Sequence, residues 1–253
     1  MSAAPVLSMP SPEPAQPRLS EWQRLVNVFV NPSRTFTDLK RKPSWWAPWL
    51  ILAITSVIFV SVVGNKIGWE RVTENQIRLD AKAVERMEKL PAEERARRME
   101  ISTTITKGFA YASPVLLLVV AAIVAAVMMG SFNFGAGAEI GFGVSMAVVM
   151  YSFLPGILKT PLTLISVLAG TDPEGFNIRN PVATNLGFFI NPVEHPVFHK
   201  LGSAFDIFAI WTIILMGIGY ACVSKLKRSS TVTTVVIWYA LITLAGVILA
   251  ALF

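Results

Sequence analysis

Long apolar stretches alternate with polar segments along most of this chain. The clearest stretch, residues 109–132, carries no charged side chain in 24 positions. A helix rises about 1.5 Å per residue and a bilayer core is about 30 Å thick, so about 20 apolar residues make one crossing. The pattern therefore predicts about five membrane-spanning helices, at residues 45–64, 109–132, 139–160, 203–223 and 232–253.

The spans are expected to be helices, because hydrocarbon offers backbone N–H and C=O groups no partner outside the segment. A membrane β-barrel would alternate polar and apolar residues, and these stretches do not. Hydrophobic residues make up 53% of the chain and charged residues 15%, against about 25% charged residues in an average soluble domain. The predicted fold is all-α, a polytopic transmembrane helical bundle that occupies residues 45–253.

The third apolar stretch continues to residue 169 but is interrupted by Pro155-Gly156, Lys159 and Pro161. One straight helix of this length would measure about 45 Å, which exceeds the hydrocarbon core. The prolines permit a kinked span with an interfacial extension, which we favour, or a re-entrant pair of short helices.

Two pairs of glycines have spacings that suit close helix contact, within one chain or between two copies. Gly137 and Gly141 stand near the start of the third stretch. Gly217 and Gly219 lie in the fourth.

The chain before the first span divides into two parts. Residues 1–19 contain five prolines and are expected to be a disordered tail rather than a cleaved leader. Residues 20–44 are expected to form amphipathic juxtamembrane helices. Ser20 and Gln23 have capping-box spacing, and Asn31-Pro32 suits an N-cap followed by the first helical position.

Residues 66–107 hold ten Lys or Arg and eight Asp or Glu. They are predicted to form a charged, water-exposed excursion of two helices joined at Pro91, with acid-before-base pairs such as Glu74 with Arg78 and Glu85 with Lys89. The excursion is either a solvated spacer or a docking surface, since it is longer than a connection requires. Residues 171–202 are turn-rich and are expected to form an ordered polar loop outside the membrane.

The cluster Lys40-Arg41-Lys42 directly precedes Trp45. Basic residues that meet an aromatic belt mark the cytoplasmic side of a span, which places the N-terminus in the cytoplasm. The ten basic residues of the excursion oppose this orientation. When they are counted, the cytoplasmic side carries nine Lys or Arg and the opposite side carries twelve. The net charge of +6 is assigned to topology and anionic lipid rather than to nucleic acid. Cys222 is the only cysteine, so no internal disulfide can form.

Candidate chemistry is sparse. His195 and His199 are four residues apart beside Glu194, a spacing seen in zinc sites, but the order of residues does not match a metalloprotease, and an ordinary loop is favoured. No catalytic or cofactor-binding motif occurs, so no catalytic, cofactor-binding or metal residue is assigned.

Three ionisable residues in or near lipid are better candidates for a site, since such charges are usually paired or functional. They are Glu139, Lys159 and Asp206. Two arrangements remain open. Either the three residues lie at the membrane–water interfaces, which the long side chain of Lys159 can reach, or Lys159 forms a buried pair with Asp206.

Several short motifs resemble those of the bacterial branch of the Ypt-interacting protein (YIP) family, over about residues 20 to 250. The residues that carry the resemblance are Asn31, Pro32, Phe36, Tyr151, Pro155, Gly156, Asp172, Pro173, Gly175, Asp206 and Trp211. The resemblance implies a five-helix membrane protein with a cytosolic N-terminal region, in a bacterial inner membrane.

The resemblance also implies partners. Eukaryotic relatives bind Rab-type small GTPases, but this chain lacks their Asp-Leu-Tyr-Gly-Pro signature, which argues against GTPase binding. Some bacterial relatives assist the assembly of ABC-type exporters, and the charged excursion would suit that role.

Two functional hypotheses follow. The first is a non-catalytic membrane adaptor or assembly factor that binds a partner through residues 66–107 or the N-terminal region. The second is a transporter or channel subunit in which the broken third helix, with Lys159 and Glu139, lines a path.

Overall fold

The computed structural model describes residues 17–252, so residues 1–16 of the predicted tail and Phe253 lie outside the described part. The described residues form helices and no strand. The prediction of an all-α polytopic bundle is confirmed. The elements in chain order are α1 Glu21–Val30, α2 Pro32–Arg41, α3 Trp46–Lys66, α4 Trp69–Arg78, α5 Ala81–Glu88, α6 Ala92–Ala136, α7 Phe142–Ser152, η1 Leu154–Leu158, α8 Lys159–Leu168, η2 Leu186–Phe189, α9 Pro196–Ala204, α10 Ile207–Ser224 and α11 Arg228–Leu252.

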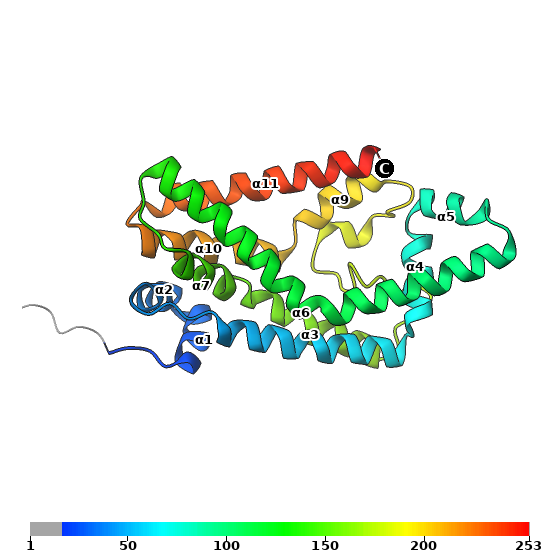
Figure 1. Cartoon of the computed structure of the whole chain (residues 1–253), viewed down its shortest axis with the longest axis horizontal. Helices are drawn as coiled ribbons and strands as arrows, with labels where there is room; N and C mark the ends of the chain where they lie inside the picture. The colour runs from blue at the N-terminus through cyan, green and yellow to red at the C-terminus, as the bar shows by residue number, and fades with distance from the viewer. Residues whose placement is uncertain (1–16, 253) are drawn as a thin grey trace, which may run out of the picture.

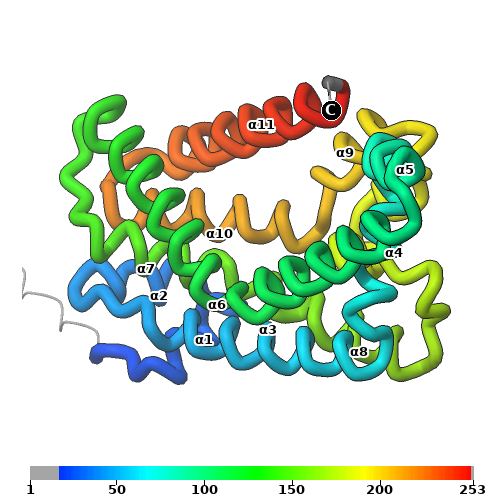
Figure 2. Tube along the Cα trace, turned by 45° about the vertical axis from the view of Figure 1, so that its right-hand side comes forward, coloured from blue at the N-terminus to red at the C-terminus, as the bar shows by residue number. Residues whose placement is uncertain are grey.

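Five helical segments of the described chain are long and apolar enough to cross a membrane: Trp46–Lys66, Ala92–Ala136, Phe142–Leu168, Ile207–Ser224 and Arg228–Ala251. They run roughly along the long axis of the molecule (Figure 1). One end, here called the N-terminal end, carries α1, α2 and the α6–α7 and α10–α11 connections. The opposite, distal end carries α4, α5 and α9 (Figure 2).

Helix α6 is a single helix of 45 residues, about 67 Å long. It changes direction midway (Figure 1), and Pro114 lies inside it, which is an ordinary cause of a helix kink. The last part of the charged excursion and the second span are therefore one continuous helix, since no proline stands between Ala92 and the apolar stretch.

The excursion contains three helical parts instead of the two predicted. Helix α4 begins after Gly68, which has a φ of 86°, helix α5 is capped by Asp80, and α6 begins after Pro91. The pair Glu85–Lys89 is present at 2.6 Å. Glu74 pairs with Arg71 rather than with Arg78.

The third span is kinked, as the favoured interpretation expected. Helix α7 packs against α6 and α10, the chain passes through the short helix η1 at Pro155, and α8 continues along α3. The span begins later than predicted, at Phe142, because residues 137–141 form the connection from α6.

The glycine pairs behave differently from one another. Gly137 ends α6 with a φ of 64° and Gly141 caps α7, and a Cβ at either would meet nothing within 4 Å. They do not mediate helix contact within the chain. A Cβ at Gly217 would lie 2.4 Å from Val232, and one at Gly219 would lie 2.6 Å from Val148, so the second pair lets α10 pack closely.

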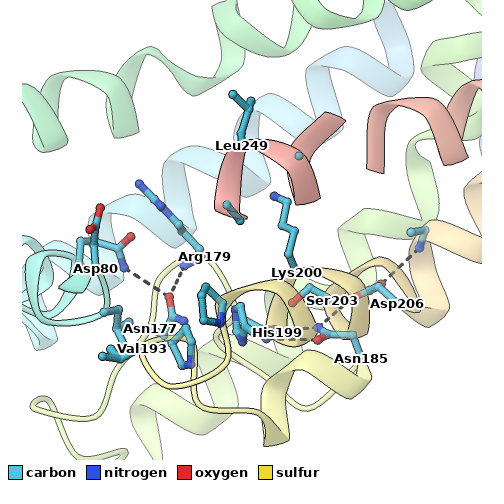
Figure 3. Close-up of a pocket in the computed structure, with 18 of the residues that line it drawn as sticks. Asp80, Asn177, Arg179, Asn185, Val193, His199, Lys200, Ser203, Asp206 and Leu249 are labelled. Atoms are coloured by element: carbon cyan, nitrogen blue, oxygen red, sulfur yellow. Dashed lines mark hydrogen bonds between the residues drawn. The ribbon is translucent and has the colours of Figure 1, made fainter. Parts of the chain in front are cut away.

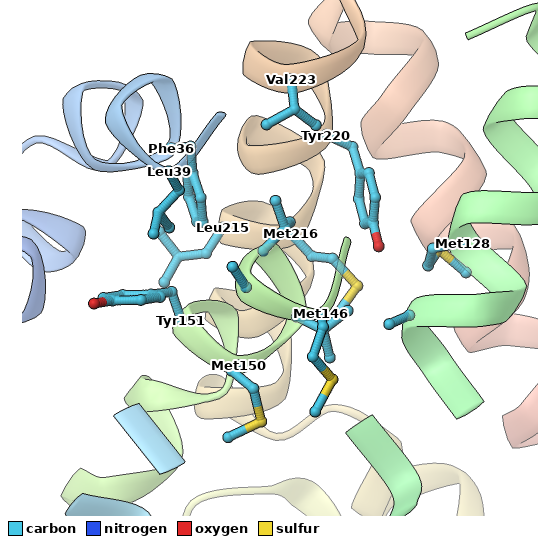
Figure 4. Packing of buried hydrophobic residues seen from close by; sticks show 14 of the residues in the cluster. Phe36, Leu39, Met128, Met146, Met150, Tyr151, Leu215, Met216, Tyr220 and Val223 are labelled. Carbon is cyan, nitrogen blue, oxygen red and sulfur yellow. The ribbon is translucent and has the colours of Figure 1, made fainter. Parts of the chain in front are cut away.

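The main core lies where α2, α6, α7 and α10 meet. Phe36 and Leu39 of α2 point towards Leu215 of α10 (Figure 4). Tyr220 stacks on Phe132 at 4.7 Å between ring centroids. The predicted juxtamembrane helix α2 is thus part of the core rather than an appendage.

The distal end has its own small core. Phe176 of the 171–202 segment is buried with Val63 and Val72. The Asn75 side chain donates to the carbonyl oxygens of Pro173 at 2.8 Å and of Phe176 at 2.9 Å. The loop is therefore docked on α4 through contacts between residues about 100 positions apart.

The fourth span starts at Ile207, four residues later than predicted. Ser203 belongs to the separate helix α9. Asp206 caps α10, and its side chain accepts hydrogen bonds from the first backbone N–H groups of that helix.

Candidate functional sites

Lys159 and Asp206 form an ion pair near the distal end. Lys159, the first residue of α8, places its Nζ 3.0 Å from Asp206 Oδ2. The other carboxylate oxygen of Asp206 accepts from the N–H groups of Phe208 at 2.9 Å and Ala209 at 3.2 Å. The pairing that the sequence suggested for these two residues is present in the structure.

Asp206 is buried, and the 171–202 segment supplies its remaining partners. The Thr184 hydroxyl donates to Asp206 Oδ2 at 2.6 Å. Asn185, beside it, exchanges side-chain hydrogen bonds with Asn180. Burial alone would raise the pKa of Asp206, but the Thr184 hydroxyl and the Lys159 ammonium outweigh it and hold the pKa below the ordinary value of 3.8. This network ties α8, α10 and the loop together.

Glu139, the third candidate charge, is not part of this network. It is exposed in the connection between α6 and α7, at the N-terminal end. Lys159 lies beyond the kink of the same span, so the structure does not bring Glu139 and Lys159 together.

A second buried network, which the sequence did not predict, holds the N-terminal helices. Arg24 is 2% exposed. Its guanidinium donates to Asp38 Oδ2 from Nε at 2.8 Å and from a terminal nitrogen at 2.7 Å, and to Glu21 at 2.9 Å. The Tyr151 hydroxyl of α7 donates to the other oxygen of Glu21 at 3.0 Å. The network joins α1 to α2 and both to the bundle.

One sequence signal could have indicated this network. Arg24 and Val28 are four residues apart and lie on one face of α1, and both are buried. An arginine in line with an apolar face requires an acidic partner when it is buried. The sequence did not show which of the nearby acids would supply it.

The residues that carry the family resemblance stand mostly where elements join. Asn31 and Pro32 begin α2, and Trp211 packs edge-on against Phe29 of α1 at 5.7 Å. Pro155 lies at the kink of the third span. In the distal loop, the Asp172 side chain accepts from the N–H of Glu174, and the Asp172 carbonyl accepts from the N–H of Gly175. These positions organise the fold, and none of these contacts forms a catalytic arrangement.

The histidine motif has structural partners. His199 places Nδ1 3.0 Å from the carbonyl oxygen of Ile190, Glu194 accepts from Asn191, and His195 lies edge-on to Phe198. Within residues 17–252, no group of three or more His, Cys, Asp or Glu side chains is placed to hold a metal ion.

Comparison with known proteins gives one match. The Yip1 domain family model matches residues 26–250. No curated protein sequence and no solved structure matches the chain. Because the Yip1 domain covers most of the chain, from within α1 to near the end of α11, this helical membrane protein belongs to the Yip1 domain family.

Proposed function

We propose that the protein is a non-catalytic adaptor or assembly factor of the bacterial cytoplasmic membrane, which binds a protein partner through its distal end. The observation that carries the proposal is the arm formed by residues 79–107, which comprises α5 and the first part of α6. No side chain between Leu79 and Val120 is buried. The arm is an ordered helical surface with little packing function of its own.

The arm has the dimensions and chemistry of a docking surface. Helix α6 is about 67 Å long and the hydrocarbon core about 30 Å thick, so about half of the helix extends beyond it. The arm carries basic and acidic side chains interspersed along exposed helix faces. Such mixed charge suits a partner with complementary charge and gives specificity more than affinity.

The orientation that we propose has the N-terminal end in the cytoplasm. That end carries Lys40, Arg41 and Lys42 beside α3, and Lys225, Lys227 and Arg228 between α10 and α11. The opposing charges of residues 66–107 belong to folded helices, where Arg71, Lys89 and Arg95 already have intramolecular partners. Residues 66–107 are short enough for the positive-inside rule to act on them and oppose this orientation, so the proposal gives more weight to the basic residues that directly abut the spans.

The partner class that the family resemblance suggests is an exporter of the ABC type. A transporter function for this chain has less support. Glu139 precedes the third span at the N-terminal end, whereas Lys159 lies beyond the kink of that span and is engaged by Asp206.

The proposal is tested by exchanging charges on the arm without altering its net charge or its fold. The variant Glu85→Lys, Lys89→Glu, Arg97→Glu, Glu100→Arg changes only exposed side chains and keeps an i,i+4 pair on α5. The full-length protein is purified in mild detergent from its native host, and co-purifying proteins are identified by mass spectrometry. The variant should insert normally and lose the partner that the wild type retains.

A matched control exchanges one charge pair at the opposite end. Glu139→Lys with Lys227→Glu also preserves net charge and alters exposed residues. This control should keep the partner. Retention of the same partner by the arm variant, or equal loss in both variants, would contradict binding through the arm.

A further inference from the structure

The distal end contains a cavity of about 890 Å³ that lies between α5, the polar loop, α9, the start of α10 and the end of α11. Its walls come from segments far apart in the sequence (Figure 3). Helix α10 begins at Ile207 and α11 ends at Leu252, so the cavity lies at the level where two spans begin and end. Lipid headgroups occupy this depth of a bilayer.

Positive charge dominates the polar side of the cavity. Two aspartates line it, but Asp206 is paired with Lys159, and Asp80 accepts the N–H of Ala83 as the cap of α5. The lining contains more cations than anions. The five basic side chains are Lys82, Arg86, Lys159, Arg179 and Lys200.

Two of these cations enter the cavity from different elements. Arg179 extends from the polar loop and Lys200 from α9 (Figure 3). The Oγ of Ser203, by contrast, is buried against Gly187 of η2 and does not face the cavity.

The other side of the cavity is apolar. Phe208 and Ala209 of α10 and Leu249 and Ala250 of α11 line it. The Lys200 side chain runs past Gly246, where a Cβ would lie 2.8 Å from Lys200 Cε. The absence of a side chain at Gly246 therefore lets the lysine stem lie against α11, with its ammonium nitrogen 3.6 Å from the position of that missing Cβ.

We propose that this cavity binds an anionic glycerophospholipid. The phosphate of the headgroup lies near Arg179 and Lys200, and the start of an acyl chain lies against the start of α10 and the end of α11. A soluble anion would use Arg179 and Lys200 but not the apolar wall, and a neutral lipid would use the apolar wall but not these two cations. The cavity shares Lys82 and Arg86 of α5 with the arm, but the proposed phosphate position uses neither of them.

The experiment measures thermal unfolding of the full chain in dodecyl maltoside during titration with dioctanoyl-phosphatidylglycerol. The lipid should raise the Tm, whereas dioctanoyl-phosphatidylcholine and inorganic phosphate should not. Arg179→Gln with Lys200→Gln should weaken the apparent affinity for phosphatidylglycerol roughly tenfold or more. The control Arg97→Gln with Arg98→Gln, which removes the same charge from exposed positions on the arm, should bind as the wild type does.

Several outcomes would overturn the proposal. An equal shift with inorganic phosphate would show a phosphate site without lipid recognition. An equal shift with phosphatidylcholine, or unchanged affinity in the Arg179→Gln, Lys200→Gln variant, would show that the cations do not select the headgroup.

A second variant tests the apolar wall separately. Ala250→Phe adds bulk to the cavity without altering charge, so it should weaken phosphatidylglycerol binding while leaving the Tm of the lipid-free protein unchanged. Wild-type affinity in Ala250→Phe would contradict placement of the acyl chain against α11.

Discussion

The buried arginine of the N-terminal helices provides the sharpest test of what holds them to the bundle. In Arg24→Met the carboxylate of Asp38, which is 6% exposed, loses both of its guanidinium hydrogen bonds. Removal of one partner from a buried ion pair typically costs about 3–5 kcal/mol, since the remaining charge stays desolvated. Because this loss falls on the two helices that the ion pair joins, we expect α1 and α2 to open locally before the spans unfold.

Hydrogen exchange of the amides in residues 21–41, followed by mass spectrometry in detergent, measures this detachment. An opening free energy lower by about 3–5 kcal/mol corresponds to exchange roughly 100 to 4,000 times faster. Arg34→Met, on the exposed side of α2, is the matched control and should leave exchange unchanged. The double variant Arg24→Met, Asp38→Met replaces the pair with apolar groups and should recover much of the protection. Equal exchange in the single and double variants would refute the assignment of the loss to an unpaired Asp38.

Three further outcomes are expected at the distal end. Lys159→Met should lower the free energy of unfolding by about 1–3 kcal/mol, since Asp206 then lacks its cation, and adding Asp206→Asn to this variant should partly restore stability. Thermal unfolding of the single and double variants measures both effects. The lowered pKa of Asp206 means that its stabilising contribution is complete above pH 3.8 and declines as the pH falls below that value. The difference in Tm between the wild type and Asp206→Asn should therefore shrink in acid, and a difference independent of pH would contradict it. Asn75→Ala leaves the carbonyl groups of Pro173 and Phe176 without their side-chain donor. This should cost about 1–3 kcal/mol and appear as faster hydrogen exchange in residues 171–180. The same substitution at the exposed Asn191 serves as the control.

The sequence predicted the spans well because their signal is local. Each crossing needs only about 20 consecutive apolar residues, and nothing distant can change that requirement. The caps at Ser20 and Asn31 were predicted for the same reason, since a cap concerns residues within one helical turn. The continuity of α6 across the change from charged to apolar residues has a local cause too, since no proline stands between Ala92 and the apolar stretch.

Contacts between distant segments were harder to predict. Lys159 and Asp206 could be proposed as a pair because few charges lie near lipid and each needs a partner. Arg24 and Asp38 lie among many charged residues near the membrane surface, where exposure is the ordinary expectation. The docking of Asn75 on residues 173–176 had no signal at all, since an asparagine in a charged helix is compatible with solvent.

Each end of the bundle is closed by one buried charged group whose partners come from several elements. Asp206 collects donors from α8, the polar loop and α10, and Arg24 bonds to acids of α1 and α2, one of which also accepts from α7. Because a buried charge is costly unless every partner is present, each network favours one arrangement of its elements. The charges that these networks do not use are therefore the informative ones for function: those of the exposed arm, and Arg179 and Lys200 of the distal cavity. The arrangement separates residues that fix the fold from residues left available for binding, which is why substitutions on the arm should alter partners without altering insertion.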